Sequence, residues 1–85
     1  AFGNARIRIE GNTDNVGNRD QNVALSKKRA QSVADFLVKE YNMDPNRFVV
    51  IGNGPDKPVA DNTTPEGRAK NRRTDFNLLS EEGKN

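Results

Sequence analysis

Several residue types are missing from this 85-residue sequence, and each absence excludes a kind of chemistry. Cysteine, histidine and tryptophan are all absent. Without cysteine the chain has no disulfide framework and no cysteine-ligated zinc site. Without histidine it lacks the commonest general base and the commonest metal ligand, so a serine such as Ser26 has no histidine to activate it as a nucleophile. No apolar run approaches the ~20 residues that a membrane-spanning helix needs.

The chain is rich in charged residues and relatively poor in apolar ones. Hydrophobic residues account for 32% of the chain and charged residues for 31%, and the net charge is only +2. So small a net charge does not hold a chain open by self-repulsion, and the length allows one domain. We therefore expect a single small domain with a thin core over residues 1–85, in which the polar segment 80–85 is a flexible tail.

Three short segments have the patterns of β-strands. Apolar and polar residues alternate over 5–10, which predicts a half-buried strand ended by Gly11. A continuous apolar run over 48–51 is typical of a strand covered on both faces, and residues 52–55 then predict a turn. Alternation returns over 74–78 and predicts a third strand.

Between the first two predicted strands the period changes to that of a helix. From 22 to 41 the apolar residues recur at helical spacing, and Asp20 or Asn22 would cap the N-terminus. The apolar stripe consists of Ala30, Val33, Ala34, Leu37, Val38 and Tyr41.

A second, short helix is predicted to end at about Asn71. Its start is either Thr64 as the N-cap with Pro65 in the first turn, or a capping box formed by Thr63 and Glu66. The order is then strand, helix, strand, short helix, strand, with the first two strands parallel. We expect an α+β fold, with helices packed on a small mixed sheet.

One pair of opposite charges is placed where ligands bind. Asp14 lies in the long loop, residues 12–20, that follows the first strand, and ligands of open α/β sheets bind beyond the ends of strands. Asn22, Ser26 and Arg29 share one helix stripe, because they are spaced by four and three residues. Together Asp14 and Arg29 would hold a zwitterion, the carboxylate on Arg29 and the ammonium on Asp14. The alternative is an internal Asp14–Arg29 salt bridge that ties down the loop.

A basic cluster near the C-terminus allows a second interpretation. It comprises Arg68, Lys70, Arg72 and Arg73. Such a cluster suits phosphate or nucleic acid, but aromatic residues for base stacking amount to only 6%. A solvated helix face is the alternative, and we expect no nucleic-acid partner. Asp14 and Asp20 lack the regular spacing of a cation-binding loop, so we expect neither a metal nor a cofactor.

A series of motifs in this order resembles the OmpA-like C-terminal domain, the family of outer-membrane protein A, peptidoglycan-associated lipoprotein and flagellar stator B subunits. The resemblance runs from about Ile7 to Leu79. The motifs are Gly11-Asn12-Thr13-Asp14, Gly17, Asn22, Leu25-Ser26, Arg29-Ala30, Val33, Gly52-Asn53-Gly54, Pro58, Asn62-Thr63, Glu66-Gly67-Arg68 and Asn71-Arg72-Arg73.

The resemblance implies non-covalent binding of peptidoglycan, with Asp14 and Arg29 gripping the diaminopimelate of the stem peptide. It implies supporting contacts from backbone groups around Thr13, Asn22 and Leu25, and a role for Arg72 at the site. It also implies a binding module and not an enzyme. The chain would then work in the periplasm or at the outer membrane of a Gram-negative-type bacterium.

Two departures from the family pattern stand out. Many members have histidine at the position of Asn12. Family domains also begin with a further strand and helix, whereas only Ala1–Asn4 precede the first predicted strand here. We therefore expect a fragment without that pair, with an incomplete pocket and apolar surface through which copies self-associate. Because the chain begins at Ala1 and its only methionine is Met43, we expect the parent protein's membrane anchor to lie outside this segment.

Two other classes of function stay open. One is a basic nucleic-acid-binding domain that uses the C-terminal cluster. The other is a structural or dimerising envelope domain with a degenerate site.

Overall fold

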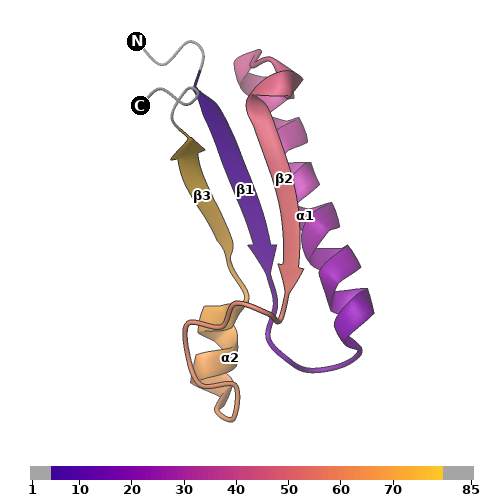
Figure 1. Cartoon of the computed structure of the whole chain (residues 1–85), viewed down its shortest axis with the longest axis vertical. Coiled ribbons are helices and arrows are strands. Elements are labelled where there is room, and N and C mark those ends of the chain that lie inside the picture. Colours follow the sequence, from indigo (N-terminus) through magenta and orange to yellow (C-terminus); the bar gives the residue numbers. More distant parts are fainter. Residues whose placement is uncertain (1–4, 80–85) are drawn as a thin grey trace.

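The computed structural model describes residues 5–79 and confirms the predicted α+β class and element order. The elements are β1 (Arg6–Asn12), α1 (Arg19–Tyr41), the short 3-10 helix η1 (Pro45–Arg47), β2 (Phe48–Gly54), α2 (Pro65–Asn71) and β3 (Thr74–Leu79) (Figure 1). The predicted flexible tail, residues 80–85, lies outside the described residues. Neither α1 nor α2 combines the length and the apolar character that a bilayer crossing requires.

The three strands form one mixed sheet in the order β2-β1-β3. β1 pairs with β2 in parallel, as predicted, with Ile9 opposite Val50. β1 pairs with β3 antiparallel, with Ile9 opposite Phe76. α1 runs along one face of β1 and β2, whereas α2 lies beyond the end at which both of these strands finish (Figure 1).

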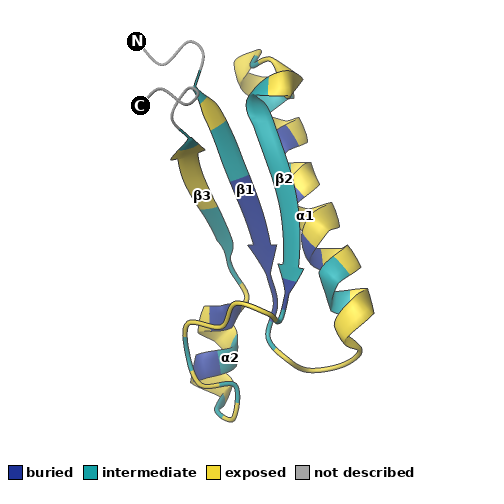
Figure 2. Ribbon diagram, in the orientation of Figure 1, coloured by how far each residue is buried: buried dark blue, intermediate teal, exposed yellow. Residues whose placement is uncertain are grey.

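The core is thin and lies between α1 and the central strand. Side chains alternate across a strand, so Ile7, Ile9 and Gly11 share the face that α1 covers. Ile9, Ala30 and Ala34 are the fully buried hydrophobic residues of the described chain, and in Figure 2 the buried colour fills the second half of β1. The partly buried residues packed around them are Ile7, Val33, Leu37, Phe48 and Val50.

Two glycines let α1 lie directly on the ends of the strands. A Cβ atom on Gly11 would stand 2.8 Å from the Ser26 carbonyl carbon, and one on Gly52 would stand 2.6 Å from the Lys27 backbone nitrogen. No larger residue fits at that separation without moving the helix. This contact fixes the height of the N-terminal half of α1 above the sheet.

α1 begins earlier than its apolar stripe predicts. Asn18 is the N-cap, and its side chain accepts a hydrogen bond from the Gln21 N–H at 3.0 Å. The prediction of Asp20 or Asn22 as the cap was wrong, because the first turn is wholly polar and adds nothing to the apolar period. The last residue of the predicted stripe, Tyr41, is 66% exposed and contacts the Phe36 ring edge-on instead of the core.

Both parallel strands extend further than predicted. β1 continues through Gly11 to Asn12, and β2 continues through Gly52 to Gly54. Gly11 and Gly52 were expected to end their strands. Here they allow α1 to pack closely on the sheet, and the hydrogen-bond ladder between the two strands continues beneath the helix. The prediction that β2 is covered on both faces was also wrong, because its residues before Gly54 are only half-buried.

α2 has the predicted bounds and one of the two predicted caps. The Thr64 side chain accepts a hydrogen bond from the Gly67 N–H at 2.9 Å, so Thr64 and not Thr63 is the N-cap. At the other end Asn71 is fully buried and accepts from the Val59 and Ala60 N–H groups at 2.7 and 3.0 Å. Asn71 thereby ties the loop before α2 to the last turn of the helix.

Candidate functional site

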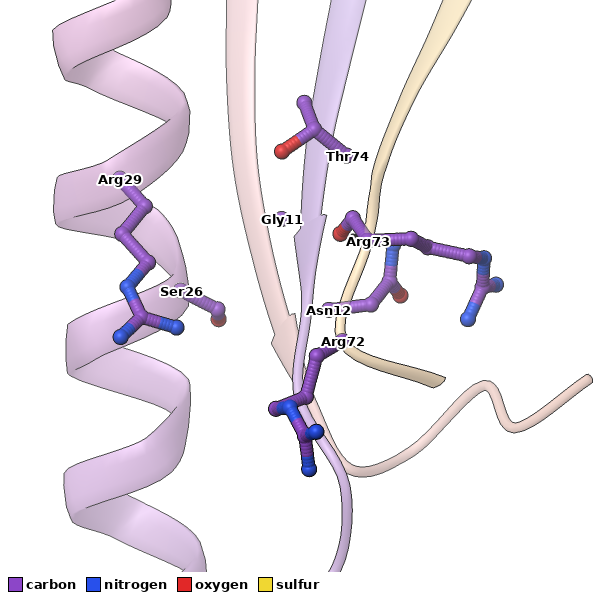
Figure 3. A pocket seen from close by; sticks show the side chains of 7 residues that line it. All are labelled: Gly11, Asn12, Ser26, Arg29, Arg72, Arg73 and Thr74. Atoms are coloured by element: carbon purple, nitrogen blue, oxygen red, sulfur yellow. Dashed lines mark hydrogen bonds between the residues drawn. The ribbon is translucent and has the colours of Figure 1, made fainter. Parts of the chain in front are cut away.

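A cleft of about 200 Å³ opens between α1 and the segment that joins α2 to β3. Figure 3 shows Arg29 and Ser26 on its helix side and Arg72 on the opposite side. The lining residues are Gly11, Asn12, Ser26, Arg29, Arg72, Arg73 and Thr74.

The ladder between β1 and β3 brings Arg72 to this cleft. Its last two bonds lie just beyond β3: the Asn12 N–H donates to the Arg73 oxygen at 2.9 Å, and the Arg73 N–H donates to the Asn12 oxygen at 3.3 Å. Because the strands are antiparallel, the residue before Arg73 lies beside the residues that follow Asn12. Arg72 therefore faces the loop that carries Asp14.

Asp14 is held by two partners at once. Its Oδ2 accepts from Arg72 Nη1 at 2.7 Å, and its Oδ1 accepts from the Val16 N–H at 3.0 Å. The Asp14 side chain is 13% exposed, while that of Arg72 is 49% exposed. These contacts, first the Val16 N–H and then Arg72, hold the pKa of Asp14 below its usual value. The loop thus presents a carboxylate that stays charged.

Arg29 lies across the cleft from Arg72, and within residues 5–79 it makes no ion pair or hydrogen bond. Arg29 is exposed and follows one turn after the buried Ser26 on α1, with its guanidinium extended along the cleft wall (Figure 3). The alternative of an internal Asp14–Arg29 salt bridge was therefore wrong: the partner of Asp14 is Arg72. The sequence pattern missed this because the pairing depends on the antiparallel return of β3.

Arg29 and Arg72 line the cleft, and Arg72 binds the carboxylate of Asp14, which does not itself line the cleft. An arginine without an ion partner offers a planar fork that suits a ligand carboxylate. A carboxylate with lone pairs to spare accepts hydrogen bonds from an ammonium group. The arrangement suits a small zwitterionic group.

Comparison with known proteins places the chain in a family. The model of the OmpA family matches residues 2–72. The chain belongs to the OmpA family. Outer membrane protein Omp38 of Acinetobacter baumannii is 54% identical over 72 residues, which cover 85% of this chain and 20% of that protein. Peptidoglycan-binding protein ArfA of Mycobacterium tuberculosis is 46% identical over 72 residues, 85% of this chain and 22% of that protein.

Solved structures confirm the fold of this OmpA-family chain. The peptidoglycan-associated lipoprotein of Burkholderia pseudomallei superposes with a TM-score of 0.85 at 32% identity, over 92% of this chain and 65% of that one. The chain spans about a fifth of the length of the two curated relatives. The recognition of an OmpA-like domain from its motifs is thus confirmed.

Of the other predicted site residues of this OmpA-family chain, Thr13 and Asn22 brace the loop around Asp14. Thr13 is buried, and its Oγ1 donates to the Asp14 carbonyl oxygen at 2.7 Å. Asn22 Nδ2 donates to the Val16 oxygen at 2.8 Å, and Leu25 is 39% exposed on α1. None of these three lines the cleft, and a contact from any of them to a ligand stays a prediction.

Three arginines of the basic cluster are engaged within the molecule. Arg72 binds Asp14, and Arg68 donates to the Asn62 carbonyl oxygen at 3.0 Å. Arg73 Nε lies 3.2 Å from the Asp75 carboxylate, and its Nη2 donates to the Lys57 oxygen at 2.9 Å. In Figure 3 the Arg73 side chain points away from Arg29. The cluster is thus divided between the cleft, the loop before α2 and the far face of the sheet.

The face of the sheet opposite α1 carries a polar network that the sequence patterns did not indicate. Glu10, 6% exposed, accepts from Asn53 Nδ2 at 2.9 Å and lies 3.0 Å from Arg8 Nε. The Asn53 hydrogen bond is the main reason that the pKa of Glu10 is lowered. Asn53 also donates to Asn12 Oδ1 at 3.0 Å. The amide that stands where many family members have histidine is therefore committed to this network.

Proposed function

We propose that this chain binds peptidoglycan non-covalently, holds the diaminopimelate of the stem peptide in the cleft, and so anchors an envelope protein to the cell wall. The observation that carries the proposal is Arg29, which has no partner within residues 5–79 and lies across the cleft from Arg72, the ion partner of Asp14. The peptidoglycan-binding name of ArfA supports the ligand class. The name of the structurally similar peptidoglycan-associated lipoprotein supports it too.

The chemistry of diaminopimelate matches these charges. In the stem peptide its free end carries an ammonium and a carboxylate on one carbon. The carboxylate would take the planar fork of Arg29. The ammonium would take the remaining lone pairs of Asp14, because each Asp14 oxygen already accepts one hydrogen bond but has room for another. The Val16 N–H and Arg72 together keep Asp14 charged, and Arg72 links it to the cleft.

The chain so described is a binding module and not an enzyme. Its natural place would be the periplasm or the outer membrane of a Gram-negative bacterium, with the parent protein's membrane anchor outside this segment. Thr13, Asn22 and Leu25 would support the ligand from the loop and from the first turns of α1.

The test is co-sedimentation of the chain with purified cell-wall sacculi. We expect enrichment in the pellet with diaminopimelate-type walls and a marked drop with walls that contain lysine in its place. Arg29→Ala should remove the chain from the pellet. Lys28→Ala is the matched control, because Lys28 is the neighbouring exposed cation of α1 and does not line the cleft. Absence of wild-type enrichment, or equal loss in both variants, would contradict the proposal.

A further inference from the structure

A chain of hydrogen bonds joins the helix that carries Arg29 to the loop that carries Asp14. Ser26 Oγ accepts from the Gly54 N–H at 2.9 Å. The Gly54 carbonyl oxygen accepts from the Thr13 N–H at 2.9 Å, and Thr13 Oγ1 donates to the Asp14 carbonyl oxygen at 2.7 Å. The end of β2 is thus the link between α1 and the loop that carries Asp14.

Ser26 is well placed to fix the position of Arg29. It is 1% exposed, and its own backbone meets Gly11 where α1 touches β1. Its Oγ also donates to the Val23 oxygen at 2.8 Å, which orients the hydroxyl toward the Gly54 N–H. Arg29 follows three residues later, on the same side of the helix.

The other end of the link has little freedom to adjust. Gly54 is buried and has a positive φ of 54°. A Cβ atom there would stand 2.6 Å from Val23 Cγ2, so α1 packs closely over this residue. If the Gly54 N–H lost its acceptor, a buried donor would be left unpaired, and the strand end would have to shift to reach another partner. Such a shift would also move the oxygen that holds Thr13.

We propose that Ser26 is a positioning residue: its hydroxyl sets the separation between Arg29 and Asp14 and so matches the cleft to the ammonium–carboxylate spacing of its ligand. This inference rests on the proposed function. It adds a residue that touches neither charge of the ligand but controls how both are presented. A serine that only stabilised the fold would affect the amount of folded protein and leave the affinity of the folded molecule alone.

The test is a double-mutant cycle on the 85-residue chain, with the tripeptide L-Ala-γ-D-Glu-meso-diaminopimelate as the probe. NMR titration gives the affinity per folded molecule and still measures weak binding. Ser26→Ala should weaken binding about tenfold, as expected for residues coupled through a shared network. In an Arg29→Ala background the same change should have a smaller effect, because only the contact to Asp14 is left to be misplaced. Ser32→Ala is the matched control, because Ser32 is an exposed serine of α1 whose hydroxyl donates only to the Lys28 oxygen.

Each outcome of the cycle is decisive. The inference is overturned, while the proposed function stands, if Ser26→Ala binds the tripeptide like the wild type. It is also overturned if Ser26→Ala loses the same factor of affinity in both backgrounds. Absence of wild-type binding overturns the proposed function itself. If Ser26→Ala does not fold, hydrogen exchange of the wild-type Gly54 and Thr13 amides decides, because ligand should slow both. Unchanged exchange in the presence of bound tripeptide would overturn the inference.

Discussion

Replacing Asp14 by asparagine tests whether the Asp14 carboxylate binds the ligand or only braces its loop. Asparagine keeps an oxygen for the Val16 N–H, which Asp14 Oδ1 now accepts at 3.0 Å. It removes the charge that Arg72 contacts at 2.7 Å. Because Arg72 is 49% exposed, solvent screens this ion pair, and such pairs stabilise a fold by about 0.2–1 kcal/mol. A loss of that size lowers the melting temperature of so small a domain by at most roughly 4–8 °C.

The effect of Asp14→Asn on binding should be much larger than its effect on stability. A charge-assisted hydrogen bond is worth about 1.5–3 kcal/mol, so loss of the contact to the ligand ammonium should weaken binding roughly ten- to a hundredfold. Thermal unfolding by circular dichroism and calorimetric titration with the diaminopimelate tripeptide should be measured on the same preparation. A variant that melts far lower yet keeps wild-type affinity per folded molecule would show that Asp14 serves the loop and not the ligand.

Four further results are expected. Arg29→Lys should weaken tripeptide binding about tenfold in the same titration while the melting temperature stays unchanged, because an ammonium makes no planar fork; full affinity would contradict this. The pKa of Asp14 is held below its ordinary value of 3.8, so its contribution to stability is present above that pH and lost only as pH falls through the folded-state value. Ligand affinity measured across an acid titration should fall in the same range, and a loss that began near neutral pH would refute the assignment. Gly11→Ala should destabilise the fold by about 1–3 kcal/mol in a denaturant titration, because the new methyl group overlaps the α1 backbone; an unchanged midpoint would show that the helix yields freely. Phe76 and Leu78 are 54% and 59% exposed on β3, an edge of the described sheet, so copies of the chain should associate; a monomer at high concentration in analytical ultracentrifugation would count against it.

Local patterns were sufficient to predict the elements themselves. The alternation around Ile7 and Ile9 and the helical spacing from Ala30 onward are short-range signals, and the strands and helices appear where those signals are. Element ends were less predictable. Gly11 and Gly52 stop a strand by propensity alone, but here they continue it, because their missing side chains admit the helix.

The candidate site was predictable in its charges but not in its pairings. The spacing of Asp14 and Arg29 placed an acid and a base at the end of β1, and the cleft lies there. The ion pair between Asp14 and Arg72 joins residues 58 positions apart, and nothing in either local sequence indicates it. The role of Ser26 was equally hidden, because its partner Gly54 belongs to a different strand. Such contacts depend on the sheet order β2-β1-β3, which local periodicity does not specify.

The most direct test of diaminopimelate recognition compares two stem tripeptides that differ in one carboxylate. One ends in meso-diaminopimelate, and the other ends in lysine, which keeps the side-chain ammonium but lacks the carboxylate beside it. Calorimetric titration of the wild-type chain should show binding of the diaminopimelate tripeptide about ten- to a hundredfold tighter, the worth of one charge-assisted contact to Arg29. The preference should disappear in Arg29→Ala. Equal affinity of the wild-type chain for both tripeptides, or a preference that survives in Arg29→Ala, would contradict recognition of diaminopimelate by this cleft.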